Sequence, residues 1–291
     1  MQTRRLGRTE HHSSVAILGG ATFMDCTAEQ ADAAVHTAVA RGVNHIDIAP
    51  TYGLAETVAG PTIGALRSQL FIGEKTARSH PDGVRAQLET SLTNLGCESF
   101  DLYQAHGVTG LDVLDSRVSA IESMLSMRDE GLFRFVGITG HDLGAPVAHL
   151  EALRRWDLDT VMFPLYPRVY ADPVYRDNVL ALLAECAARD VGVMVIKAAA
   201  KQPWGEQKPT HGTWYEPQTT PEGIRHGIRF ALSHPGVHAF CSPGDLSLLP
   251  LVLDAAEGFV PYTDTERAEA VSTALADNDL PIFPLAENAQ H

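Results

Sequence analysis

Four polar residues of complementary chemistry stand at or just after the ends of short apolar segments: Asp47, Tyr52, Lys75 and His106. A tyrosine is a poor acid near neutrality, with an unperturbed pKa of ~10. An adjacent ammonium group lowers that pKa, and Lys75 is the candidate, with Asp47 holding it charged. His106 would hydrogen-bond a substrate oxygen. Such a group can protonate a carbonyl oxygen while hydride reaches the carbon from another source.

Each of these residues alone also has an ordinary structural explanation. An aspartate at a strand end is often a turn or cap residue, a lone histidine is usually structural, and Lys75 would serve equally as a solvated lysine. The group gains weight from its spacing. The carboxyl ends of neighbouring strands in a parallel barrel meet at one rim, where active sites are built.

Apolar strand-like runs alternate with amphipathic helical patterns along the chain. Strands are predicted over residues 15–18, 44–48, 71–73, 100–106, 133–139, 160–163, 192–197 and 237–241, and helices over 27–40, 83–95, 115–128, 173–188 and 221–232. Thr27 with Gln30 forms a capping-box pattern at the first helix. Glycines that suit left-handed helix ends follow several helical stretches: Gly42, Gly96, Gly131 and Gly192.

This rhythm predicts an α/β fold, a single (β/α)8 TIM barrel. The competitor is a doubly wound open sheet, but no Gly-x-Gly-x-x-Gly follows the first strand. Since no linker or low-complexity segment interrupts the pattern, we expect one domain over residues 1–291. A long loop after strand seven, about residues 198–220, is predicted to act as a lid or pocket wall. The alternative is an ordered surface excursion.

Composition narrows the class of protein. With 291 residues, 45% hydrophobic and 20% charged, the chain suits a globular protein with a full core. A net charge of −14 argues against nucleic-acid binding. The four cysteines are dispersed, which disfavours disulfides and a zinc site, and His141 with Asp142 has no third metal ligand. Without a signal peptide or membrane span in the sequence, we expect a cytoplasmic protein and no membrane partner.

Several motifs together resemble the aldo-keto reductase family. They are Arg5-Leu6-Gly7-Arg8-Thr9, Ile17 to Phe23, Gly42 to Gly53 with the Asp-x4-Tyr element, Leu88 to Gly96, Asp101 to His106 with Leu-Tyr-x2-His, and Glu130 to Ile138. The resemblance covers most of the chain and implies a barrel preceded by an N-terminal hairpin. It also implies that Asp47, Tyr52, Lys75 and His106 are a catalytic tetrad in which Tyr52 donates the proton.

The resemblance further implies a nicotinamide dinucleotide lying extended over the barrel mouth. The candidate contacts are Gly20, Ala21, Thr22, Asp47, Thr139, Gly140, Lys197, Ala198, Ala199, Ala200, Lys201, Ser242, Gly244 and Asp245. Backbone N–H groups at a following helix start suit the pyrophosphate, and Lys201 is either an extra phosphate contact or a solvated loop lysine.

The chain departs from the family pattern in this cofactor region. Gly140 stands where the family usually has Asn, leaving Thr139 and the neighbouring His141 to grip the carboxamide, and Phe163 stands where it usually has Gln. After strand eight no Lys or Arg is available for a 2′-phosphate, whereas Asp245 could accept a ribose hydroxyl. The family's usual preference favours NADP(H) and the local chemistry favours NAD(H), so the sequence leaves both open.

Substrate contacts are expected at Phe23, Tyr52, His106, Trp204 and Trp214. The sequence therefore predicts an NAD(P)-dependent oxidoreductase that interconverts a small carbonyl compound and an alcohol. Two alternatives remain: a cofactor-binding regulatory subunit, and a non-redox isomerase or lyase on the same scaffold. The substrate, the physiological direction and the oligomeric state are not predicted.

Overall fold

Eight parallel strands form a closed barrel in the computed structural model, which describes residues 1–277 and 280–283. Around the barrel the order is β12-β3-β4-β5-β6-β7-β8-β9, so each strand pairs with the next in the chain and β12 closes the ring. The strands are β3 (Ala16–Gly19), β4 (His45–Asp47), β5 (Phe71–Thr76), β6 (Phe100–Ala105), β7 (Phe133–Thr139), β8 (Thr160–Pro164), β9 (Gly192–Ile196) and β12 (Ala239–Cys241). The predicted (β/α)8 barrel is confirmed, and the open-sheet alternative was wrong.

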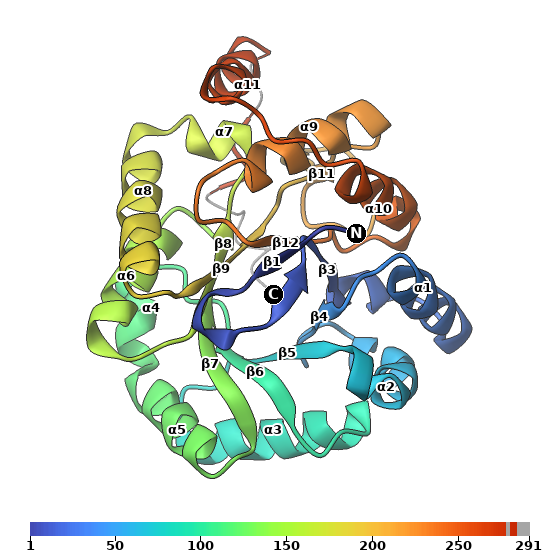
Figure 1. The fold of residues 1–291 in the computed structure, drawn as a ribbon, viewed down its shortest axis with the longest axis vertical. Coiled ribbons are helices and arrows are strands. Elements are labelled where there is room, and N and C mark those ends of the chain that lie inside the picture. Colours follow the sequence, from blue (N-terminus) through green and yellow to red (C-terminus); the bar gives the residue numbers. More distant parts are fainter. Residues whose placement is uncertain (278–279, 284–291) are drawn as a thin grey trace.

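Helices surround the barrel (Figure 1). They are α1 (Ala28–Ala40), α2 (Ala55–Ala65), α3 (Pro81–Leu95), α4 (Leu111–Ser116), α5 (Val118–Asp129), α6 (Ala145–Arg155), α7 (Pro167–Tyr170), α8 (Pro173–Ala188), α9 (Pro221–Leu232), α10 (Leu249–Glu257) and α11 (Asp264–Ala276). The capping box of Thr27 and Gln30 at α1 is confirmed. The helix predicted over 115–128 is interrupted at Arg117, which leaves helical geometry between α4 and α5 and donates to the Arg78 carbonyl.

The glycine prediction is right at three helix ends and wrong at the fourth. Gly42, Gly96 and Gly131 have φ of 84°, 60° and 84°. Gly192 instead begins β9, and Asp190 takes the left-handed conformation with φ 55°. A Cβ on Gly192 would lie 2.8 Å from Leu6 Cγ, so close packing beneath the N-terminal segment explains this glycine.

The expected N-terminal hairpin is present and closes the amino-terminal mouth of the barrel. Strands β1 (Thr3–Arg5) and β2 (His12–Ser14) pair antiparallel, and Figure 1 shows them across the centre of the ring. His11 stacks on Phe71 at the start of β5, with ring centroids 4.4 Å apart. With this end plugged, the opposite mouth is left for ligands.

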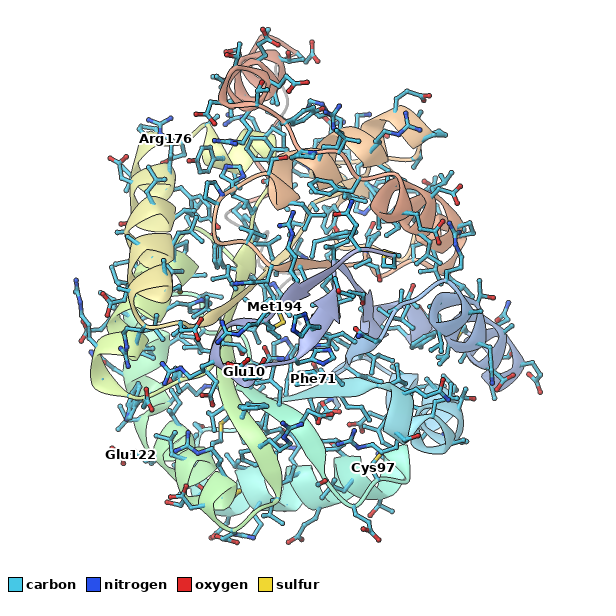
Figure 2. All side chains as sticks on the ribbon, in the orientation of Figure 1. Glu10, Phe71, Cys97, Glu122, Arg176 and Met194 are labelled. Atoms are coloured by element: carbon cyan, nitrogen blue, oxygen red, sulfur yellow. The ribbon has the colours of Figure 1, made fainter. Side chains whose placement is uncertain are left out.

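Apolar side chains fill the barrel interior. One cluster contains Leu6, Ile17, Phe71, Leu102, Met162, Met194 and Ala239. In Figure 2, Phe71 and Met194 lie near the barrel centre, whereas Cys97, Glu122 and Arg176 lie out on the helical ring. Since side chains alternate along a strand, Phe71, Gly73 and Lys75 face inward in turn. The same rule turns Leu102 and Gln104 inward, with His106 following at the end of β6.

The loop over 198–220 is partly ordered as a strand pair. Strand β10 (Ala200–Gln202) pairs antiparallel with β11 (Glu216–Pro217). Between them the loop is tied to the segment after β12, because the Gly212 N–H donates to Asp245 Oδ2 at 2.7 Å. The Asp245 side chain also caps the 3-10 turn η4 (Leu246–Leu248). The loop therefore crosses the carboxyl-terminal mouth, while its function as a lid stays a prediction.

None of the helices in the described part of the chain is long and apolar enough to span a membrane. The expected single domain over 1–291 stays a prediction, and its residues 278–279 and 284–291 lie outside the described part.

Candidate active site

Asp47 and Lys75 form a buried ion pair inside the carboxyl-terminal mouth. They come from the adjacent strands β4 and β5, where Asp47 lies opposite Gly73. Lys75 Nζ pairs with Asp47 Oδ2 and donates to the Ile48 carbonyl at 3.0 Å. Each residue is 1% exposed. Burial alone would lower the pKa of Lys75, but the attraction of Asp47 and Tyr52 outweighs it and raises that pKa, so Lys75 is charged.

A third residue, Gln104, completes the support of this pair. Its Nε2 donates to Asp47 Oδ1 at 2.7 Å, so both carboxylate oxygens are engaged. Gly73 leaves the space for this contact, since a Cβ there would lie 3.2 Å from Asp47 Oδ1 and 3.5 Å from Gln104 Nε2. Sequence reasoning did not single out Gln104. The available signal was strand alternation, because Gln104 precedes His106 by one inward-facing step.

Tyr52 lies against Lys75 at the same mouth. Lys75 Nζ is 5.0 Å from the centroid of the Tyr52 ring. Burial raises the pKa of Tyr52 to about 12, against the opposing effect of the Lys75 charge. The expectation of a net lowered pKa is therefore not what the structure shows. Lys75 does act in the expected direction, but loss of water around the phenol is the larger effect.

His106 contacts Tyr52 edge to face. The ring centroids are 5.8 Å apart with an interplanar angle of 87°, and His141 lies 5.8 Å from His106 on another side. Burial, followed by the charge of Lys75, holds the pKa of His106 well below its ordinary value. His106 is consequently a neutral imidazole, able to donate one hydrogen bond without bringing a second cation beside Lys75.

A cavity opens on these residues, with about 490 Å³ of space when the part open to solvent is included. Its lining combines the catalytic candidates with strand ends from around the barrel: Gly19, Ala21, Asp47, Tyr52, Lys75, Thr139, His141, Met162, Ile196, Lys197, Trp214, Tyr215, Cys241, Ser242, Pro243 and Gly244. His106 is absent from this set but touches Tyr52 and His141, which belong to it. The structure thus brings Asp47, Tyr52 and Lys75 together at one cavity, with His106 in contact with Tyr52.

The residues at this cavity fit a nicotinamide dinucleotide. Two buried polar atoms at expected contact positions, Thr22 Oγ1 and His141 Nδ1, have no hydrogen-bond partner within the described structure. Thr139 adds a hydroxyl to the cavity lining, whereas Ala21 and Gly244 add little or no side chain there. A Cβ on Gly244 would meet Ala21 at 3.1 Å. Unpaired polar atoms beside small residues suit a polar ligand that approaches the backbone closely.

Some expected contacts lie elsewhere. Phe23 is fully buried in the core between barrel and helices, and Trp204 donates to the Thr213 carbonyl away from the cavity lining. Lys201 pairs with Glu216 at 2.6 Å and lines a different pocket with Ala200. On β8 the inward-facing residue is Met162, whereas Phe163 packs outward under the helices. Phe163, which stands where the family usually has Gln, therefore does not face the cavity.

The structure also shows the surroundings of three other expected contacts, Gly140, Asp245 and Trp214. Gly140 has no room for an amide side chain, because a Cβ there would lie 2.0 Å from the Val108 carbonyl oxygen. Asp245, expected to accept a ribose hydroxyl, already accepts from Gly212 and Ser247. Trp214 does reach the site, with its ring 6.4 Å from that of Tyr52. No cluster of three or more potential metal ligands occurs within residues 1–277 and 280–283.

A model of the Aldo/keto reductase family matches residues 16–226. The chain belongs to this family. The match confirms the resemblance seen in the sequence motifs. It lends no support to a regulatory subunit or a non-redox enzyme.

Two curated relatives illustrate the level of similarity. The chain is 28% identical over 153 residues to the uncharacterized oxidoreductase YqkF of Bacillus subtilis, covering 48% of this chain and 49% of YqkF. It is 27% identical over 251 residues to the L-galactose dehydrogenase of Arabidopsis thaliana, covering 80% of this chain and 75% of that protein. The alignment thus spans about half the length of the first relative and three quarters of the second.

Solved structures share the fold. The holo form of the aldo-keto reductase AKR11C1 from Bacillus halodurans superposes with a TM-score of 0.73 at 19% identity, covering 94% of this chain and 96% of that one. The aldose reductase from Giardia lamblia gives 0.67 at 16% identity, covering 92% and 94%. At these identities the likeness concerns the barrel, so the substrate has to be argued from the site.

Proposed function

We propose that this protein reduces an aldehyde or ketone with a reduced nicotinamide dinucleotide, or oxidises the corresponding alcohol, with Tyr52 as the proton-transfer group. The observation that supports this most strongly is the contact of the Tyr52 ring with the buried Lys75–Asp47 pair at the cavity. A bound nicotinamide would supply or accept the hydride.

Each member of the tetrad has a separate role in proton transfer. The Tyr52 hydroxyl protonates the carbonyl oxygen during reduction, and its pKa of about 12 keeps it in the required acid form at neutral pH. The Lys75 ammonium stabilises the phenolate that remains. Asp47, fixed by Gln104, holds Lys75 charged. The neutral His106 donates a hydrogen bond that orients the oxygen.

Dinucleotide binding would use polar groups at the cavity and next to it. Thr139 and His141 would meet the carboxamide, and Ser242, the backbone at Gly244 and Thr22 beside Ala21 would meet the remainder. We propose a preference for NAD(H), because residues 242–254 contain no Lys or Arg to neutralise a 2′-phosphate.

A substrate panel tests this function. Aldehydes, ketones and alcohols are offered with NADH, NADPH, NAD+ or NADP+ while nicotinamide absorbance is followed, and isothermal titration gives the affinity for each dinucleotide. The proposal requires turnover of at least one carbonyl compound with a stoichiometric absorbance change. Binding without any turnover, or substrate conversion with no change in nicotinamide absorbance, would contradict it. Tighter binding of NADP(H) than of NAD(H) would contradict the cofactor preference alone.

A further inference from the structure

Lys197 is a buried cation that the proton-transfer machinery does not use. It follows β9 directly, is 8% exposed and lines the same cavity as Tyr52 and Lys75. No carboxylate pairs with it and no hydrogen bond holds its ammonium within the described part of the chain, in contrast to Lys75 and Lys201. Burial lowers the pKa of Lys197 to about 8, as expected for an ammonium without a counter-ion.

Aromatic rings are the neighbours that this ammonium does have. Lys197 Nζ lies 5.1 Å from the Trp214 ring centroid and 4.7 Å from that of Tyr215. Cation–π contacts of this kind stabilise a charge but replace only part of its lost hydration. The rings also hold the ammonium toward the cavity, so an anion entering it would complete the site.

The backbone at Lys197 adopts a strained conformation. Its φ is 68°, a conformation that residues other than glycine rarely adopt, and its carbonyl accepts the Ala200 N–H at 2.9 Å. Strained residues cluster at ligand sites, because the surrounding structure must hold them there. A lysine at this position is therefore an additional sign of a ligand contact.

The charge of the cavity lining also favours an anion. Among the described residues that line the cavity, the one carboxylate is Asp47, which is already paired with Lys75. His141 has a pKa lowered to about 3 by burial and nearby lysines and is neutral. Lys197 thus leaves this described lining with one net positive charge. Trp214 contacts both Lys197 and Tyr52, so the positive charge and the proton donor share one neighbouring side chain.

We propose that the Lys197 ammonium binds an anionic group of the substrate, so that the protein acts on carbonyl compounds that carry a carboxylate. The inference rests on the proposed function and narrows its substrate class. The closest competing ligand for the same ammonium is the pyrophosphate of the dinucleotide, and the experiment below separates the two.

The test compares oxo-carboxylates having one to four carbons between carbonyl and carboxylate with their neutral primary amides. We expect the wild-type protein to prefer at least one acid over its amide by about tenfold or more in kcat/KM. Lys197→Met keeps the length and the backbone strain but removes the charge, and should raise KM for the acid by about 10- to 100-fold while leaving the amide unchanged. Lys197→Arg should restore part of the preference.

The control variant is Lys201→Met, which removes a lysine of the same loop that is paired with Glu216 and lines the other pocket. It should leave the acid-to-amide ratio unchanged. Isothermal titration of the same acids and amides into dinucleotide-saturated protein gives a second readout that does not depend on turnover. Lys197→Met should weaken binding of the acid alone.

Three results would overturn the inference. Equal use and equal binding of acid and amide by the wild-type protein would show that the carboxylate is not recognised. An equal loss for both compounds in Lys197→Met would indicate a structural role. Weaker dinucleotide binding with an unchanged acid-to-amide ratio would assign Lys197 to the pyrophosphate. Absence of turnover with every carbonyl compound would instead contradict the proposed function, while the titration would still decide whether the acid binds at Lys197.

Discussion

The ammonium of Lys75 lies 5.0 Å from the centre of the Tyr52 ring while it is paired with Asp47. One cation thus serves two groups: it satisfies a buried carboxylate and faces the phenol that would transfer a proton. The contact between Lys75 and the ring would not be expected if Tyr52 and Lys75 pointed into separate regions. Their convergence at a cavity is the geometry on which the proposed chemistry depends.

Removing the Tyr52 hydroxyl tests the proton donor. We expect Tyr52→Phe to lower kcat for carbonyl reduction by about 10²–10⁴-fold, the usual contribution of a general acid. Dinucleotide affinity and the melting temperature should be nearly unchanged, since Lys75, the partner of the hydroxyl among the described residues, stays held by Asp47 and the Ile48 carbonyl. The control is Tyr262→Phe, whose hydroxyl contacts His226 outside the cavity lining. Wild-type-like turnover of Tyr52→Phe would refute the assignment.

The two reaction directions should depend on pH differently. With its pKa raised to about 12 by burial, Tyr52 stays protonated from pH ~6 to ~10, so kcat/KM for reduction should be flat there. Alcohol oxidation needs the phenolate and should rise by about tenfold per pH unit over the same range. The raised pKa of Lys75 and the lowered pKa of His106 keep both residues from titrating in this window.

This pH measurement should use uncharged substrates, because Lys197 has a pKa of about 8 and lines the same cavity. A reduction rate that falls about twofold by pH ~10 and about tenfold by pH ~11 with such a substrate would mean that the phenol titrates near its ordinary value of ~10. It would also mean that Lys75 outweighs burial, contrary to the structure.

Gly73 should be intolerant of a side chain. Even a Cβ at residue 73 would lie only 3.2 Å from Asp47 Oδ1. The further atoms of Gly73→Val would displace Asp47 from Gln104. We expect kcat to fall on the order of 10- to 100-fold, because small misplacements of catalytic groups are costly. Steady-state kinetics and a melting curve check this.

The matched control is Gly83→Ala on α3, where the nearest side-chain atom would be 3.6 Å away. It should keep full activity and gain about 0.5–1 kcal/mol in the free energy of unfolding, as alanine favours helix. Equal activity of both variants would show that Asp47 does not need its position fixed.

At neutral pH, the Glu74 side chain should lower the free energy of unfolding. It is fully buried beside Lys75, and burial, followed by repulsion from Glu56, raises its pKa well above the ordinary 4.5. Above pH ~4.5 the unfolded chain releases this proton while the folded protein retains it, so Glu74 increasingly favours unfolding as pH rises. Glu74→Gln keeps an acceptor for the Lys75 N–H. It should raise the melting temperature at pH ~8 by roughly 2–4 °C.

The gain from Glu74→Gln should shrink as the pH falls and should be nearly lost at pH ~3.5, where both the folded and the unfolded state hold the proton of the wild-type side chain. Glu89→Gln, which changes an exposed carboxylate on α3, should have little effect at either pH. A melting temperature lowered by Glu74→Gln at pH ~8 would mean that the charged form of Glu74 is stabilised in the fold.

The alternation of strands and helices was sufficient to predict the barrel, because each element carries its own periodic pattern. Strand β7 and helices α8 and α9 were predicted with the bounds that the structure gives. The tetrad could be proposed for a related reason. Polar residues at the ends of Asn44–Ile48 and its neighbours must converge once the strands are parallel and closed.

Tertiary structure decided what depends on burial and on contacts between distant segments. The acidity of Tyr52 follows from how much water the fold removes, which no local pattern encodes. Lys197 and Lys201 have different surroundings because of the turn after β9. Lys197 itself has a left-handed backbone and lines the cavity, whereas Lys201 pairs with Glu216. The sequence by itself therefore determined which chemical groups are available at the barrel mouth. Only the folded chain decided which of them are buried, which are paired, and which charge is left for a ligand.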